Sequence, residues 1–215
     1  MNKISDAVSE VVEGNPFLLF GFSRGLMNLT QLAHFIQPMI QLRTKKEIQI
    51  SALVMNLSRM QRTFKKIVPK TEEFYVDTLT VHSHLSLYTF QNTFETNKEI
   101  NNLYNKVHEK NAYVGITRGT HEIMLIIESS FDELVEKTVA KGFKNKRSPL
   151  SAIGMTFDEK YEEVPGFLYI VFQQMILQNI TVIETASTYT EIILYVDEKD
   201  TKLAFETLYT AFHKS

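Results

Sequence analysis

The 215-residue sequence contains no cysteine. Disulfides, thiolate nucleophiles and thiolate metal sites are therefore all excluded. Long apolar runs are also missing, because no stretch approaches the roughly 18 residues that a membrane-spanning helix needs. The N-terminus carries Asp6 early and has no apolar signal core, so we expect no secretion segment and no membrane partner, and we predict a cytoplasmic protein.

The common motifs of enzyme active sites are largely absent. There is no Gly-x-x-x-x-Gly-Lys phosphate loop and no His-Glu-x-x-His zinc motif. The segment 21–25 reads Gly-Phe-Ser-Arg-Gly and formally matches Gly-x-Ser-x-Gly, the motif of a nucleophile elbow. That elbow requires a preceding strand in a large sheet, whereas this segment lies in a helical pattern. We interpret the match as coincidence and predict no enzyme, no catalytic residue and no cofactor.

Three histidines are candidate zinc ligands. His82 and His84 share one strand face, and His121 begins a strand that would neighbour theirs in the sheet expected below. Three imidazoles could bind zinc. Since the spacing fixes no acidic partner for them, we expect surface histidines and no metal site.

Charge is distributed unevenly along a chain that is otherwise typical of a globular protein, with 44% hydrophobic and 22% charged residues. Residues 1–70 hold ten Lys or Arg and four Asp or Glu, a net charge of +6, whereas residues 71–215 hold 13 and 21, a net charge of −8. A basic domain beside an acidic one suggests that the first part meets a polyanion.

Residues 1–70 show helical periodicity throughout. Helices are expected from Ile4, from Pro16, from a cap at Asn28 or Thr30, and over 48–66. Pro38 interrupts the third of these, so we expect a break near Gln37. The apolar face expected for that helix comprises Leu32, Phe35, Ile36, Met39, Ile40 and Leu42.

Beyond residue 72 the periodicity changes to that of strands, and one order of elements occurs twice. In both 72–143 and 144–215 the order is strand, helix, strand, strand, helix. In the first copy we expect a helix over 98–109 and another over 131–140 that ends with Gly142. The fold class predicted is α+β: an all-α, helix-turn-helix-like domain over 1–70, followed by two tandem ferredoxin-like units over 72–143 and 144–215.

The second copy also resembles a known family. The residues concerned are Val164-Pro165-Gly166-Phe167, Asn179-Ile180-Thr181-Val182 and Leu208-Tyr209-Thr210-Ala211-Phe212. Together they resemble the aspartokinase-type ACT domain over about residues 148–215. The first copy resembles it only in element order and lacks the Pro-Gly. The resemblance implies a domain that binds an amino acid or a similar small molecule and acts in pairs, so a homodimer is expected.

A candidate ligand site follows at the Pro-Gly. Because Gly166 has no side chain, a ligand could approach the backbone N–H groups at the start of the next helix, where the helix dipole favours a carboxylate. Four acidic residues in 158–163 would instead favour an amine. The alternative is that Gly166 is only a turn residue. The residues expected at the site are Thr156, Asp158, Val164, Pro165, Gly166 and Phe167, with Thr185 and Ser187 as neighbours.

The helix over 48–66 is the candidate DNA-binding element. Its polar side carries amide and arginine groups of the kinds that read base edges or phosphates. The alternative is an ordinary amphipathic helix with a solvated face. The contacts expected are Gln49, Ser51, Asn56, Arg59 and Arg62, with Lys45 and Lys46 on phosphate.

Two functions therefore remain open. The first is a dimeric, ligand-responsive transcriptional regulator that senses a small molecule through its ACT-like units and binds DNA through its basic helical domain. The second is a free-standing regulatory or assembly subunit of an enzyme of amino-acid metabolism, without DNA binding.

Overall fold

The computed structural model describes residues 3–64, 74–161, 163–164 and 166–213. The chain divides into two compact units, residues 1–70 and 71–215. Among the described residues, no helix combines the length and the apolar character required to cross a lipid bilayer.

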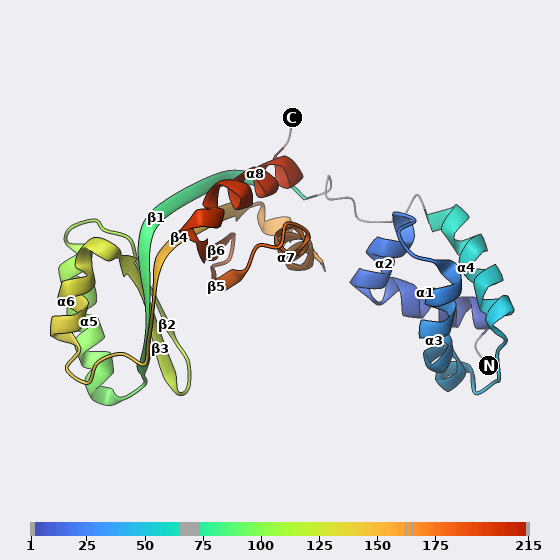
Figure 1. The fold of residues 1–215 in the computed structure, drawn as a ribbon, viewed down its shortest axis with the longest axis horizontal. Helices are drawn as coiled ribbons and strands as arrows, with labels where there is room; N and C mark the ends of the chain where they lie inside the picture. The colour runs from blue at the N-terminus through green and yellow to red at the C-terminus, as the bar shows by residue number, and fades with distance from the viewer. Residues whose placement is uncertain (1–2, 65–73, 162, 165, 214–215) are drawn as a thin grey trace. The chain divides into compact units, whose positions relative to one another are not determined.

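The described part of the first unit is a cluster of α-helices around one apolar core (Figure 1). The helices are α1 (Ile4–Glu13), α2 (Pro16–Ser23), α3 (Leu29–Thr44) and α4 (Ile50–Phe64). Their start points follow from the sequence, since Asn15 caps α2 through Leu18 N (3.1 Å) and Asn28 caps α3 through Thr30 N (2.9 Å).

Helix α3 differs from its prediction in two ways. It runs without a break through Pro38, which is exposed. Proline at this position removes one backbone hydrogen bond, but the helix continues. Only one side of the helix packs against α1 and α4. Leu32, Ile36 and Ile40 are buried there, whereas Phe35, Met39 and Leu42 are exposed.

The second unit contains the predicted tandem repeat. The first repeat comprises β1 (Val76–Gln91), α5 (Phe94–His108), β2 (Val114–Arg118), β3 (Glu122–Glu128) and α6 (Asp132–Thr138). The second comprises β4 (Asn145–Phe157), α7 (Phe167–Leu177), β5 (Val182–Ser187), β6 (Glu191–Asp197) and α8 (Thr201–Phe212). Short 3₁₀ turns precede α6, α7 and α8. The α+β fold class with two βαββα units is therefore confirmed.

The strands of both repeats form one antiparallel sheet in the order β2-β3-β1-β4-β6-β5. The first strands, β1 and β4, are long neighbours at its centre, and they bend together along their length (Figure 1). Each repeat has three strands of its own, so β4 supplies the fourth strand beside β1, and β1 supplies the fourth strand beside β4. The two ferredoxin-like units therefore share their central strands.

Successive side chains of each strand point to opposite faces of the sheet, and the buried ones form three separate apolar cores. Tyr88 and Phe90 face α5 and α6 in the core of the first repeat, and Ile153 and Met155 face α7 and α8 in the core of the second. The opposite sheet face carries a third cluster drawn from both repeats, made of Leu85, Leu87, Ile126, Leu150, Ala152 and Tyr195. The bent sheet thus covers part of the face that its helices leave open.

Two helix boundaries in the first repeat differ from the sequence prediction. Helix α5 begins at Phe94 rather than Lys98, because the Thr93 side chain accepts a hydrogen bond from Thr96 N (3.2 Å). Helix α6 ends at Thr138, and Gly142 lies in the turn beyond it with φ 71°.

Candidate functional site

The start of α7 is shaped by a glycine rather than by a capping side chain. Gly166 is the N-cap with φ 104°, a conformation that side-chain-bearing residues rarely adopt. Apart from its two neighbours in the chain, no described residue has an atom within 4 Å of the position that a Cβ on Gly166 would take. Among the described residues, no side chain caps the first turn of α7. The first backbone N–H groups of α7 therefore receive no capping side chain from the described residues.

The segment between β4 and α7 carries the acidic residues expected there. Asp158 accepts hydrogen bonds from the Lys160 backbone N (3.0 Å) and from Lys160 Nζ (2.9 Å), and these bonds lower the pKa of Asp158. Glu159 and Glu163 are exposed. The negative charge of Asp158 is thus balanced by Lys160. The exposed carboxylates of Glu159 and Glu163 could face a cationic group.

The predicted site residues on either side of Gly166 differ in their exposure. Phe167 is 3% exposed and packs against Phe74, Phe157 and Tyr161 in the core of the second repeat. As the first residue of a helix that packs on the sheet, it points inward and does not line an open mouth. Pro165 lies outside the described residues. Val164 is 41% exposed beside Gly166.

The other predicted neighbours lie on two different strands. Thr156 pairs with Thr78 on one side and with Glu191 on the other, at the end of β4. Thr185 and Ser187 lie on β5, which β6 separates from β4. The structure therefore places Thr156 at the end of the strand that precedes α7, and the β5 residues along the outer edge of the sheet.

A hollow that the sequence did not reveal lies along this edge. It has a volume of about 490 Å³ and is formed by the C-terminal half of α7 and by β5. Its lining residues are Phe172, Met175, Ile176 and Ile180–Thr185. Thr185 therefore belongs to this hollow.

The predicted DNA-contacting residues form the outer side of α4 and the turn before it. All are exposed except Asn56, which is half-buried and donates through Nδ2 to Ala52 O (2.8 Å) on its own helix. Arg62 also lines a hollow of about 580 Å³ with Arg24, Gly25 and Gln61. The sequence analysis did not include Arg24, because it lies in a different helical segment.

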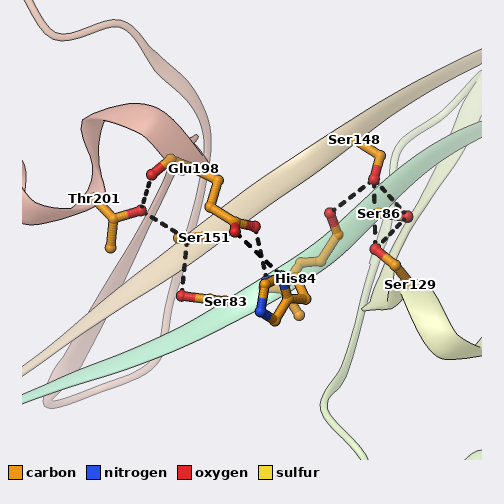
Figure 2. A network of polar contacts seen from close by, with 9 residues as sticks. Ser83, His84, Ser86, Ser129, Ser148, Ser151, Glu198 and Thr201 are labelled. Carbon is orange, nitrogen blue, oxygen red and sulfur yellow. Dashed lines mark hydrogen bonds and ion pairs between the residues drawn. The ribbon is translucent and has the colours of Figure 1, made fainter.

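A polar network lies at the centre of the sheet. It follows the middle of β1, between the part that packs with the second repeat and the part that packs with the first. Figure 2 shows two groups of side chains along β1 and β4. In one, Glu198 accepts from the His84 backbone N (3.1 Å) and contacts His84 Nδ1 (3.1 Å). Thr201 Oγ1 lies 2.8 Å from Ser151 Oγ, which donates to Ser83 Oγ (3.2 Å). His84 has φ 59° at a shift in the pairing register between β1 and β4.

The other group occupies the corresponding place in the first repeat. Ser86 Oγ is 2.9 Å from Ser129 Oγ, 3.0 Å from Ser148 Oγ and 3.1 Å from Asp132 Oδ2. Lys146 Nζ lies 2.9 Å from Asp132 and 5.0 Å from the centre of the Tyr88 ring. Contacts with Tyr88 and then with Asp132 raise the pKa of Lys146, and burial raises the pKa of Tyr88. Both groups join a central strand to the start of a helix.

A tyrosine pair joins the two repeats across the folded sheet. The hydroxyls of Tyr113 and Tyr195 are 2.8 Å apart, and burial raises the pKa of both. His82 lies on Tyr113, with ring centres 4.7 Å apart. His121 is beside Asn92, at the other end of β1, so the three histidines considered for zinc are not brought together. Among the described residues, no group of three metal-ligating side chains was found.

Sequence comparisons gave no identification: no family model matches the chain, and no curated protein matches it. Comparison of folds was informative. The ligand-free regulatory subunit of aspartate kinase from Thermus thermophilus superposes with a TM-score of 0.51 at 10% identity, covering 65% of this chain and 99% of that one. The second unit has the fold of aspartokinase regulatory domains. The predicted ACT resemblance is thus confirmed as a fold and covers both repeats.

Two longer aspartate kinases are matched over only part of their length. The aspartate kinase of Clostridium acetobutylicum gives a TM-score of 0.53 at 12% identity, and that of Synechocystis gives 0.52 at 11%. The chain covers 35% and 32% of them, respectively. The matched proteins include separate regulatory subunits, and the likeness lies with these regulatory parts rather than with a catalytic domain.

Proposed function

We propose that this chain is a ligand-responsive regulatory protein whose tandem ACT unit binds an amino acid or a similar small molecule. The observation that carries the proposal is the match along 99% of a regulatory subunit. The open helix start at Gly166 supports it further. A carboxylate would bind the first N–H groups of α7, and an amine would face Glu159 and Glu163.

The decisive experiment is a thermal-shift screen of the full chain against the twenty amino acids. A ligand at 100 times its dissociation constant stabilises a protein by about 2.7 kcal/mol, which raises the melting temperature measurably. Gly166→Ala should abolish the shift, whereas Thr93→Ala, at the corresponding helix start of the first repeat, should retain it. A flat screen, or an equal shift in Gly166→Ala, would contradict this site.

We infer that the regulated target is an enzyme of amino-acid metabolism and that the chain acts as a cytoplasmic homodimer. The regulatory subunits among its structural neighbours support this reading. Affinity purification of the full chain, with and without the ligand from the screen, should recover one such enzyme in a ligand-dependent amount. Recovery that is independent of ligand would indicate an assembly subunit instead of a sensor.

DNA binding through α4 is the second candidate, favoured by the exposure of Lys45, Lys46 and Arg62 in a unit of net charge +6. Fluorescence anisotropy with duplex DNA should then show affinity that falls steeply with salt. Arg62→Ala should weaken it, while Lys137→Ala, an exposed lysine of the acidic unit, should not. No salt-sensitive binding, or equal effects of both variants, would remove this candidate.

A further inference from the structure

The helical first unit contains a hollow of about 580 Å³ whose lining is mainly polar. It lies between the end of α2, with the turn that follows, and the C-terminal half of α4. The lining includes Arg24 and Gly25 from the first element and Ser58, Gln61 and Arg62 from the second. A concavity of this volume is in the range of sites that hold a small molecule.

The end of α2 is a turn in which the helix carbonyls are bonded. Gly25 has φ 70°, and its backbone N–H donates to Phe22 O (3.1 Å). The N–H of Leu26 donates to Gly21 O (2.8 Å), which completes a glycine-dependent helix end. Gln61 Nε2, on α4, also donates to Phe22 O (3.3 Å). The segment 21–25 is thus a helix-ending turn and not a nucleophile elbow, and its bonded carbonyls repel an anion less than bare ones would.

Two arginines line the hollow from different helices. Arg24 is the C-cap of α2, and its guanidinium carbon lies 5.9 Å from the centre of the Phe20 ring. Arg62 belongs to the last turn of α4. Both residues are exposed, and within the described part of the chain neither forms an ion pair with a carboxylate. Both guanidinium groups can therefore bind an external anion.

The hollow has a positive character because none of its described lining residues is acidic. The surrounding sequence also lacks acid, since residues 14–46 and 48–64 contain no Asp or Glu. Glu13 and Glu47 precede α2 and α4, whereas the hollow lies at the C-terminal ends of both helices. Helix α4 has 15 residues, which corresponds to a length of about 22 Å. No carboxylate of α2, α3 or α4 therefore competes for the two arginines.

A serine on α4 adds a hydroxyl donor to the same lining. Ser58 precedes Arg62 by four residues, so the two side chains lie on one face of the helix. Ser58 is half-buried, and among the residues that the structure describes its hydroxyl has no hydrogen-bond partner. The hollow thus presents two cationic groups and one neutral donor.

We propose that this hollow binds a small molecule through a phosphate monoester, held between Arg24 and Arg62 with the Ser58 hydroxyl as a further donor. A guanidinium offers parallel N–H groups that fit two phosphate oxygens. A phosphate monoester has three terminal oxygens and a charge of about −1.5 to −2 at pH 7, so it can bind both arginines and the hydroxyl together. A carboxylate or a phosphodiester has two terminal oxygens and one charge, so it satisfies this donor set less well.

Titration of the ¹⁵N-labelled full chain with inorganic phosphate, followed by amide chemical shifts at constant ionic strength, tests the site. Saturable shifts should appear in residues 23–27 and 58–62. Arg24→Gln and Arg62→Gln should each raise the dissociation constant at least about 10-fold, because each removes charge-assisted hydrogen bonds. Arg43→Gln removes the same charge from the same unit outside the hollow, and should change the constant less than about twofold because salt screens it. The amide spectrum also shows whether each variant is folded.

Dimethyl phosphate and acetate, titrated in the same way, should bind at least about 10-fold more weakly than phosphate. Shifts that never saturate, equal binding of either control anion, or an equal loss in Arg43→Gln would overturn the assignment. If a DNA duplex shifts these amides and phosphate does not, the hollow contacts a nucleic-acid backbone and the monoester assignment is wrong. The hollow lies within the first unit and the titration contains no amino acid, so its outcome is independent of ligand binding at Gly166.

Discussion

The two repeats of the second unit have the same order of elements, but their exposed residues differ in character. The first helix of the first repeat begins at the capping side chain of Thr93, and its edge is tied by Arg118 to two asparagines. The first helix of the second repeat begins at Gly166, without a described cap, and its edge is apolar. The buried faces follow one pattern in both repeats. The fold is therefore set by the inward residues, which leaves the exposed residues free to differ between the two repeats.

The largest effect is expected for cavities in the two cores, and it tests whether the two repeats unfold independently. Because β1 and β4 serve both, a cavity in either core should destabilise the whole unit. Leu125→Ala in the first core and Leu194→Ala in the second should each lower the free energy of unfolding by about 2–5 kcal/mol. Denaturant titration, followed by hydrogen exchange in β3 and in β6, should show one shared transition for each variant.

The matched control is Leu177→Ala, since Leu177 is an apolar side chain that is 59% exposed. At concentrations at which the chain is monomeric, its effect on unfolding should be below about 0.5 kcal/mol. If Leu125→Ala released β3 while β6 stayed protected, the repeats would be independent domains, and the shared central strands would not couple them.

The second prediction concerns the starts of α7 and α5, which are a glycine and a capping threonine, respectively. Gly166→Ala forces a side chain into φ 104° and should cost about 1–2 kcal/mol of stability, although the space for the methyl group is empty. Thr93→Ala removes one capping bond and should cost about 1 kcal/mol. Thermal unfolding without ligand measures both. A Gly166→Ala protein as stable as wild type would show that this backbone conformation is not required.

Much of this architecture can be predicted from the sequence, because local patterns determine it. The start of α7 could be predicted, since an apolar helical run follows directly after Pro165-Gly166. The repeat was visible in the order of strands and helices. The sharing of β1 and β4 was not, because alternation shows which side chains are buried but not which strand is the neighbour.

The candidate site was predicted less well, for a related reason. The position of Gly166 follows from its type, whereas the inward direction of Phe167 depends on how the helix packs against the sheet. The hollow beside β5 depends on the pairing order of the strands. The uninterrupted α3 likewise depends on the side to which Pro38 points. Tertiary packing decides each of these, and no local pattern records it.

The smallest expected effect concerns the place where the two repeats meet. His84 has φ 59° at the register shift of β1, and Glu198 of the second repeat holds its backbone N–H. Because this conformation disfavours a side chain, His84→Gly should be more stable than His84→Ala by up to about 1 kcal/mol. Both variants lose the exposed contact between Nδ1 and Glu198, so that loss cancels in the comparison. Chemical denaturation of the two proteins side by side measures the difference. Equal stabilities would mean that β1 straightens when His84 is removed, and that the bend between the repeats is imposed by the histidine itself and not by the backbone contact with Glu198.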